Sequence, residues 1–326
     1  MKIGIIGLGK IAKRVAKGVQ CAHNAELYAV ASRDLENANE FKESFGASVA
    51  YGSYEELLSD DNVELVYICT PNVLHKEHIM LCLKYRKHVL CEKPFVSNQE
   101  QLQECFSYAK QQGCFLMEAE KTLFTPLNQK LKKMVEEGVI GKLRYIEAGY
   151  CTKMDVEEYP KDSWLFRKED GGSFYDVGVY PICYANLFAN ASLAHVEVMK
   201  QNSAYAGIDI LTQAMLGYEN GVMAYVRSSW GVDMINRGYL YGDEGVIITD
   251  NFWKSTSAIL RKDGKDTRIE VSMESDFTGE IEHAVDCIQQ GYLQSPILSQ
   301  ERSEQIMKVL EEMHVCNCVH EEKSVK

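Results

Sequence analysis

The segment Gly7-Leu8-Gly9-Lys10-Ile11-Ala12 lies between a short apolar run and a helix-length stretch. In such a G-x-G-x-x-A pattern the first Gly permits a tight turn and the second lets a phosphate approach the backbone. The small last residue lets helix and strand pack closely. Free N–H groups at the positive helix end can then bind a pyrophosphate. The motif, placed inside an expected strand–helix unit, predicts a dinucleotide site.

The second expected strand ends in Ser32-Arg33-Asp34, where an NAD-specific site usually offers an acid to the ribose hydroxyls. The hydroxyl of Ser32 and the guanidinium of Arg33 suit a 2′-phosphate, which an acidic side chain would repel. Asp34 could equally be only the N-cap of the next helix. The segment therefore favours NADP over NAD, and NAD stays possible.

Lys93 stands in Cys91-Glu92-Lys93-Pro94-Phe95, where another expected strand ends. Ligands of doubly wound folds bind at the carboxyl edge of the sheet. A lysine at that edge can exchange a proton with an alcohol or carbonyl oxygen during hydride transfer. The alternative is a solvated lysine at the start of a loop.

The elements that must position these residues follow from periodicity. Residues 1 to about 120 alternate β-branched runs with amphipathic segments, which predicts βα units and a parallel sheet. The expected strands are Lys2–Gly7, Leu27–Ser32, Val63–Thr70, Lys87–Glu92 and Cys114–Glu118. The expected helices are Ile11–Cys21, Leu35–Phe45, Lys76–Tyr85 and Gln99–Gln112.

After Pro126 one helix, Leu127–Glu137, precedes consecutive alternating runs, which predict a mainly antiparallel sheet. These strands are Lys142–Tyr150, His195–Tyr205, Asp209–Leu216, Gly221–Trp230, Arg237–Tyr241 and Val246–Thr249, and two helices follow at Gly279–Gln290 and Ser299–His314. We expect an α/β fold: a Rossmann doubly wound parallel sheet at 1–120, and an α+β domain for substrate binding and dimerisation at 121–326. The last helices could pack back on the first domain.

Composition narrows the classes of partner. The 326 residues carry a net charge of −12, and no long basic block appears, so we expect neither a nucleic acid nor a membrane partner. The eleven cysteines are scattered singly, as expected of reduced, buried thiols. The chain has no 18-residue apolar stretch and no signal-peptide pattern, which predicts a cytoplasmic protein. His75 and His78 lack a third ligand, so no metal is expected.

Several motifs together resemble those of the Gfo/Idh/MocA oxidoreductase family. The resemblance covers essentially the whole chain and rests on the glycine motif, Thr70-Pro71-Asn72 with His75, Glu92-Lys93-Pro94, and Gly171-Gly172-Ser173 followed by Asp176, Gly178 and Tyr180. Tyr180 stands where this family often has His. With Ser32-Arg33-Asp34, it looks most like the branch of dimeric dihydrodiol dehydrogenases and NADP-dependent D-xylose dehydrogenases.

The resemblance implies that Lys93, Asp176 and Tyr180 surround the nicotinamide, with His75 and Trp164 beside the cofactor, and that the second domain's sheet forms a homodimer contact. An alcohol must lose a proton as hydride leaves it, and a positive charge nearby would favour the phenolate of Tyr180 as the base. Lys93 could carry the proton instead. Asp176 lies four residues before Tyr180, so on a helix both would share one face and Asp176 could accept a substrate hydroxyl.

Two departures from the family pattern concern the pocket. Glu120 and Lys121 stand where relatives often carry an aromatic residue or Arg, and Arg167 lies three residues after Trp164 instead of directly after it. The identity of the substrate therefore stays open.

We expect an NAD(P)-dependent dehydrogenase or reductase acting on a CH–OH group of a small polyhydroxylated substrate: an aldose, a polyol or a cyclic diol. Two alternatives are a cofactor-binding sensor without turnover and redox-assisted glycoside cleavage. The presence of Lys93, Asp176 and Tyr180 together argues against a sensor.

Overall fold

The computed structural model describes residues 1–155, 158–160, 162–203, 207–316 and 318–321. These form two compact units, Met1–Phe124 with Glu274–Ser303, and Thr125–Met273 with Glu304–Lys326. The division into domains at 1–120 and 121–326 stays a prediction. Among the described residues, no helix has the length and apolar character needed to cross a membrane.

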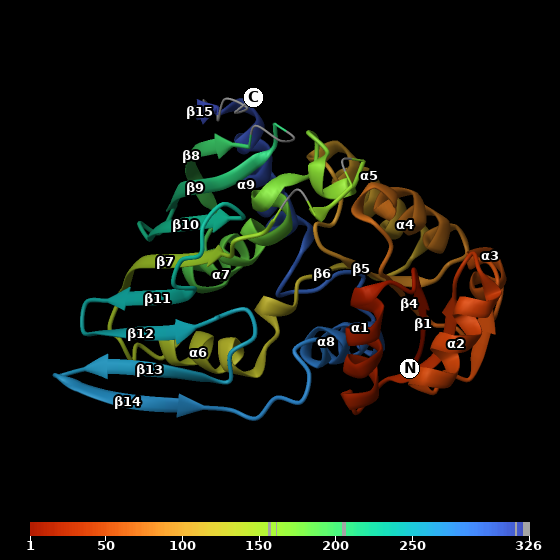
Figure 1. Cartoon of the computed structure of the whole chain (residues 1–326). Helices are drawn as coiled ribbons and strands as arrows, with labels where there is room; N and C mark the ends of the chain where they lie inside the picture. Colours follow the sequence, from red (N-terminus) through yellow and green to blue (C-terminus); the bar gives the residue numbers. More distant parts are fainter. Residues whose placement is uncertain (156–157, 161, 204–206, 317, 322–326) are drawn as a thin grey trace. The chain divides into compact units, whose positions relative to one another are not determined.

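The first unit is built on a six-stranded sheet in the order β3-β2-β1-β4-β5-β6 (Figure 1). The strands are β1 (Lys2–Ile6), β2 (Glu26–Ala31), β3 (Val49–Tyr51), β4 (Leu65–Ile68), β5 (His88–Glu92) and β6 (Leu116–Ala119). Every neighbouring pair is parallel. All six carboxyl ends therefore lie along one edge of the sheet, as the expected Rossmann fold requires.

Helices connect these strands, and their boundaries follow local chemistry. They are α1 (Lys10–Cys21), α2 (Leu35–Phe45), α3 (Tyr54–Leu58), α4 (His75–Lys84), α5 (Gln99–Gln112) and, from later in the chain, α8 (Thr278–Gln289). The side chains of Asp34, Ser53 and Asn98 accept N-cap hydrogen bonds. Gly46 and Gly113 end their helices in the left-handed conformation. The sequence analysis missed β3 and α3, which are short.

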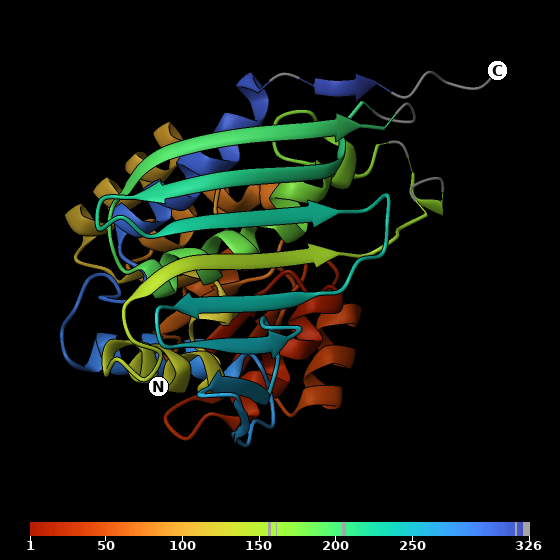
Figure 2. The same ribbon diagram turned by 90° about the vertical axis from the view of Figure 1, so that its left-hand side faces the viewer.

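The second unit contains a nine-stranded sheet in the order β14-β13-β12-β11-β7-β10-β9-β8-β15 (Figure 2). The strands are β7 (Leu143–Cys151), β8 (Leu193–Asn202), β9 (Asp209–Tyr218), β10 (Met223–Ser229), β11 (Arg237–Gly242), β12 (Gly245–Asp250), β13 (Ser257–Lys262), β14 (Lys265–Glu270) and β15 (Cys318–Glu321). Within this sheet, only the β7–β10 and β8–β15 pairs are parallel among the described strands. The prediction of a mainly antiparallel sheet is confirmed. Tyr205, the expected end of one strand, lies outside the described residues.

One face of this sheet is covered and the other is open. The helices α6 (Pro126–Glu136) and α7 (Val179–Ala189) belong to this unit, and α9 (Gln300–Val315) begins in the first unit and continues into it. Residues Ala214, Leu216, Ala224 and Val226 of β9 and β10 are buried, whereas Met215 and Met223 on the same strands are exposed. Figure 2 shows the open face of the sheet toward the viewer.

Candidate active site

The glycine motif forms the turn from β1 into α1. Gly7 has φ +84°, and a Cβ at this position would lie 2.7 Å from the backbone nitrogen of Thr70, so only glycine fits. Gly9 is the N-cap of α1, no side chain caps the helix, and its first turn carries no acid. The space in front of Gly9 is open to 4 Å. The residues present therefore fit a pyrophosphate on the N-terminus of α1. Leu8 and Ile11 are half-buried, and Lys10 is exposed.

Ser32, Arg33 and Asp34 follow β2 and make different contacts. The carboxylate of Asp34 accepts a hydrogen bond of 2.9 Å from the N–H of Glu36, so Asp34 is the N-cap of α2. The hydroxyl of Ser32 accepts one of 3.2 Å from the N–H of Asp34. Arg33 is exposed, and its positive charge opposes the rise that burial causes in the pKa of Tyr54. The guanidinium is thus an accessible positive charge at this point.

His75 ties together two loops at the carboxyl edge of the sheet. Its Nε2 lies 2.8 Å from the carbonyl oxygen of Thr70, after β4. Its Nδ1 lies 2.9 Å from the carbonyl oxygen of Pro94, after β5. The imidazole is 1% exposed, and burial lowers its pKa. The structure thus gives His75 a bracing role between these loops, and the expected contact with the cofactor stays a prediction. Pro71 is exposed, and Asn72 is buried.

Lys93 is the one partly exposed residue between Val89 and Val96. It follows β5 directly and is joined to Pro94 by a cis peptide bond. Its positive charge acts on three buried carboxyl groups, those of Glu92, Glu118 and Glu120, and opposes the rise that burial causes in the pKa of each. Lys93 is therefore partly exposed to solvent and lies near three buried carboxyl groups.

Asp176 and Tyr180, in the second unit, are also partly exposed residues within a buried segment. From Gly171 to Ala189 every residue is buried except these two. Asp176 lies in a π-helical segment, Phe174–Gly178, and Tyr180 lies in the first turn of α7. Both residues therefore lie on helical backbone, and the expectation that their side chains share one face stays a prediction. Both side chains are accessible on an otherwise buried helix.

Aromatic side chains of the second unit surround Tyr180. The ring of Tyr150 lies 5.6 Å from that of Tyr180, and the ring of Trp253 lies 6.5 Å away. Tyr150 and Trp253 stack on each other at 3.8 Å. Trp164 and Tyr180 both pack against the apolar cluster of Leu165, Phe166, Val177, Ile208 and Trp230. The phenol of Tyr180 is therefore held beside apolar ring surfaces.

Three residues that departed from the family pattern are engaged elsewhere. Arg167 forms an ion pair of 2.7 Å with the buried Asp170. Glu120 and Lys121 are 0% and 4% exposed, and the ammonium of Lys121 pairs with Asp276. Both residues belong to the first unit, and their bearing on the identity of the substrate stays a prediction.

Sequence reasoning missed Tyr67, Tyr150, Asp209, Trp253 and Glu280. Trp253 lies in a segment without periodicity, and Glu280 lies almost 190 residues after Glu92. An acidic residue among apolar positions, as at Asp209 and Glu280, was the available signal, because such groups are rarely buried without a specific partner.

Comparison with known proteins assigns both parts of the chain to one family. Residues 1–120 match the family model described as "Oxidoreductase family, NAD-binding Rossmann fold", and residues 128–248 match the "GFO/IDH/MocA C-terminal domain". The trans-1,2-dihydrobenzene-1,2-diol dehydrogenase of Mus musculus is 30% identical over 322 residues, which are 96% of this chain and 95% of that protein.

Solved structures share the fold. A 3-ketoreductase from Actinomadura kijaniata, crystallised with TDP-benzene and NADP, has a TM-score of 0.80 at 26% identity over 95% of this chain and 96% of its own. An aldose-aldose oxidoreductase from Caulobacter crescentus has a TM-score of 0.87 at 21% identity, over 97% and 96% of the two chains, which shows the fold alone. The chain belongs to the Gfo/Idh/MocA family and is an NAD(P)-dependent oxidoreductase.

Proposed function

We propose that the enzyme transfers hydride between NADP and a CH–OH group of a small polyhydroxylated substrate, with Lys93, Asp176 and Tyr180 as its catalytic residues. The observation that carries the proposal is their selective exposure, because each is accessible within an otherwise buried segment. The relatives support the substrate class: the mouse protein is named a dehydrogenase of a cyclic diol, and the Actinomadura protein a 3-ketoreductase.

NADP is favoured over NAD by the end of β2. Arg33 is exposed, while the carboxylate of Asp34 is occupied by the backbone N–H of Glu36. A guanidinium can bind a 2′-phosphate through two parallel hydrogen bonds. The Actinomadura ketoreductase was crystallised with NADP. Gly7, Gly9 and the N-terminus of α1 hold the pyrophosphate in this proposal.

The chain's own groups handle the proton. The bound nicotinamide supplies the hydride acceptor or donor. Lys93 or Tyr180 takes the proton of the alcohol during oxidation and returns it during reduction. Asp176 accepts a hydrogen bond from a substrate hydroxyl and so orients the reacting carbon. Other structures of the Actinomadura ketoreductase carry a single replacement of a lysine or of a tyrosine, the residue types invoked here.

Steady-state kinetics with a panel of sugars, polyols and cyclic diols test this assignment. Lys93→Met should abolish turnover, and Tyr180→Phe should lower kcat by about 10²- to 10⁴-fold, the usual contribution of general acid–base catalysis. Asp176→Asn should raise KM and lower kcat together. The matched control is Tyr292→Phe, at a tyrosine 50% exposed in the first unit. Near-normal kcat/KM in both Lys93→Met and Tyr180→Phe would overturn the assignment.

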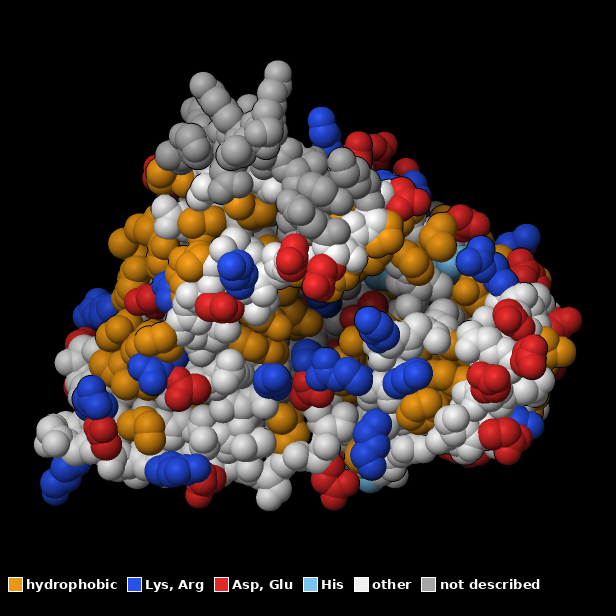
Figure 3. Space-filling model, viewed as in Figure 1, with side chains coloured by type: hydrophobic (Ala, Val, Ile, Leu, Met, Phe, Trp, Pro, Cys, Tyr) orange, Lys and Arg blue, Asp and Glu red, His pale blue; other side chains and the backbone are white. Residues whose placement is uncertain are grey.

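We also propose a homodimer formed through the open face of the nine-stranded sheet. Met199, Met215 and Met223 are 50%, 42% and 49% exposed on β8, β9 and β10. The register places Tyr225 opposite Met215, and Tyr145 opposite Met223. Hydrophobic side chains gather over these strands at the left of Figure 3. The same face carries the Arg227–Glu147 ion pair, and an exposed apolar patch rimmed by polar residues is typical of a protein contact. The cytoplasmic location expected from the sequence also stays a proposal.

A further inference from the structure

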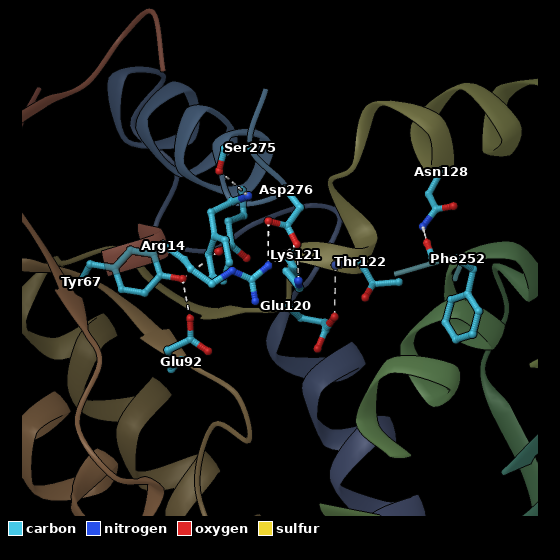
Figure 4. A network of polar contacts seen from close by, with 12 residues as sticks. Arg14, Tyr67, Glu92, Glu120, Lys121, Thr122, Asn128, Phe252, Ser275 and Asp276 are labelled. Carbon is cyan, nitrogen blue, oxygen red and sulfur yellow. Dashed lines mark hydrogen bonds and ion pairs between the residues drawn. The ribbon is translucent and has the colours of Figure 1, made fainter. Parts of the chain in front are cut away.

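The hydroxyl of Tyr67 lies between two buried carboxyl groups of the first unit. Its oxygen is 2.9 Å from Oε1 of Glu92, at the end of β5, and 2.7 Å from Oε1 of Glu280, in α8. Tyr67 and Glu280 are fully buried, and Glu92 is 6% exposed. Figure 4 shows Tyr67 directed at Glu92, with Glu120, Lys121 and Asp276 nearby.

This geometry fixes a minimum number of protons. A phenol hydroxyl has one hydrogen to donate and can also accept. It can therefore donate to one of the two carboxyl oxygens only. The second contact becomes a hydrogen bond when that carboxyl is protonated and donates to the phenol oxygen. At least one of Glu92 and Glu280 is therefore protonated, because two carboxylates on one hydroxyl would leave one contact repulsive.

The surroundings favour the negative charge on Glu92. Burial raises the pKa of Glu92, and the positive charge of Lys93 is the largest influence that opposes the rise. The charge of Lys121 lowers the pKa of both Glu92 and Glu280. Burial and the charge of Glu92 raise the pKa of Glu280 well above its usual range. The second carboxyl oxygen of Glu280, Oε2, has no hydrogen-bond partner among the described residues. A full negative charge there would be poorly compensated.

The other titratable groups near these hydrogen bonds are consistent with a negative charge on Glu92 and a proton on Glu280. Glu120 disfavours a second negative charge on Glu92 or Glu280, and burial together with both glutamates raises the pKa of Cys69. Glu118 also lies within reach of the charge of Lys93. Lys121 is already paired with Asp276, which Arg14 contacts at 2.7 Å.

We propose that Glu280, Tyr67 and Glu92 form a directed proton-holding chain, in which protonated Glu280 donates to Tyr67 and Tyr67 donates to Glu92, so that Glu92 stays an anion beside Lys93. Glu280 and Tyr67 are then positioning residues: they set the pH range over which Lys93 exchanges its proton. This inference rests on the proposed role of Lys93.

Two isosteric substitutions should affect the pH profile differently. Glu92→Gln removes the anion beside Lys93, so the ammonium form of Lys93 is less favoured and the acid limb of the kcat/KM profile for alcohol oxidation should move to lower pH by about one unit. Glu280→Gln keeps a donor toward Tyr67, because its amide replaces the protonated acid. The limb should then stay where it is in the wild type.

Difference infrared spectroscopy of the full-length protein at pH 8 locates the proton without substrate or cofactor. Because Glu118 is a second buried acid with a raised pKa, the wild-type spectrum should contain more than one carbonyl stretch of a protonated carboxylic acid. The band of Glu280 is the one that Glu280→Gln loses and Glu92→Gln keeps. The control is Glu282→Gln, on α8, whose carboxylate pairs with His23. It should leave the stretch and the profile unchanged. Thermal melts check that each variant is folded.

A Glu280→Gln spectrum that loses no carbonyl stretch relative to the wild type would overturn the proton assignment. A Glu280→Gln profile shifted as far as that of Glu92→Gln, or an unshifted Glu92→Gln profile, would overturn the link to Lys93. If instead Lys93→Met keeps its turnover, the proposed function fails. The infrared result still stands on its own in that case, because it requires no role for Lys93.

Discussion

The carboxylate of Asp209, in β9, accepts a hydrogen bond of 2.7 Å from the hydroxyl of Ser173. It also accepts one of 3.0 Å from the N–H of Phe174, where the π-helical segment begins. Gly172 has φ +88°, and a Cβ there would lie 2.0 Å from Oδ1 of Asp209. The buried carboxylate of Asp209 therefore packs against the Gly171-Gly172-Ser173 motif and anchors, through these hydrogen bonds, the segment that carries Asp176.

Replacing Asp209 by Ala should loosen this segment. The substitution leaves Ser173, Phe174 and Thr212 without their common acceptor, and each unsatisfied buried donor costs about 1–3 kcal/mol. We expect a lower melting temperature and a lower kcat, with unchanged NADP affinity measured by fluorescence titration. Asp209→Asn, which keeps one oxygen acceptor, should lie between Asp209→Ala and the wild type. An Asp209→Ala enzyme with normal kcat would contradict the anchoring role.

Arg33→Ala should change cofactor preference. Loss of a charged hydrogen bond to the 2′-phosphate should weaken NADP binding by about 1.5–3 kcal/mol and leave NAD binding nearly unchanged, as followed by titration with both cofactors. Arg268→Ala is the control, because this arginine pairs with Glu270 on β14. Equal weakening of both cofactors would remove the assignment of Arg33.

Glu118→Gln should flatten the dependence of stability on pH. Burial raises the pKa of Glu118 from 4.5 to about 8 in the folded protein. The unfolded chain loses this proton above about pH 4.5, whereas the folded chain keeps it. The free energy of unfolding therefore falls between these values as pH rises, by up to about 1.4 kcal/mol per pH unit.

Thermal melts from pH 5 to 8 measure this slope. The amide introduced by Glu118→Gln cannot ionise, so the variant should show a shallower decline than the wild type. The control Glu104→Gln, at a carboxylate 47% exposed and paired with Lys76, should keep the wild-type slope. Identical slopes for wild type and Glu118→Gln would show that Glu118 is not protonated in the folded state.

Met215→Lys should disrupt the proposed dimer. Met215 lies on the open face of β9 between Glu197 and Tyr225 of the neighbouring strands, so the substitution puts a solvated ammonium into the centre of the contact. Sedimentation at micromolar concentration should give a dimer for the wild type and a monomer for the variant. Tyr292→Lys, outside this sheet, should stay dimeric. A wild-type monomer would refute the proposal.

Local patterns located the longer elements of the first unit. The strands and helices expected between Lys2 and Gln112 lie within two residues of their places in the structure, because strand and helix periods differ and Asp34, Asn98, Gly46 and Gly113 mark helix ends. The same patterns located the glycine turn, Lys93 at a strand end, and the spacing of Asp176 and Tyr180.

Elements without a periodic contrast were missed. Helix α7 is buried around its whole circumference apart from Tyr180, so it has no polar face to reveal a helical period. Strand β14 has the opposite character, since five of its six residues are exposed. Neither pattern distinguishes helix from strand in the sequence alone.

The amino-acid sequence by itself determined the fold class, the dinucleotide turn and the residue types available for proton transfer, because these depend on spacing along the chain. Only the tertiary structure decided which carboxyl groups are buried and what they contact. Glu280 reaches Tyr67 across 213 residues, and Asp209 reaches Ser173 across 36. Burial and the number of donors at each contact set the charge of these groups, and both arise only when distant segments pack together.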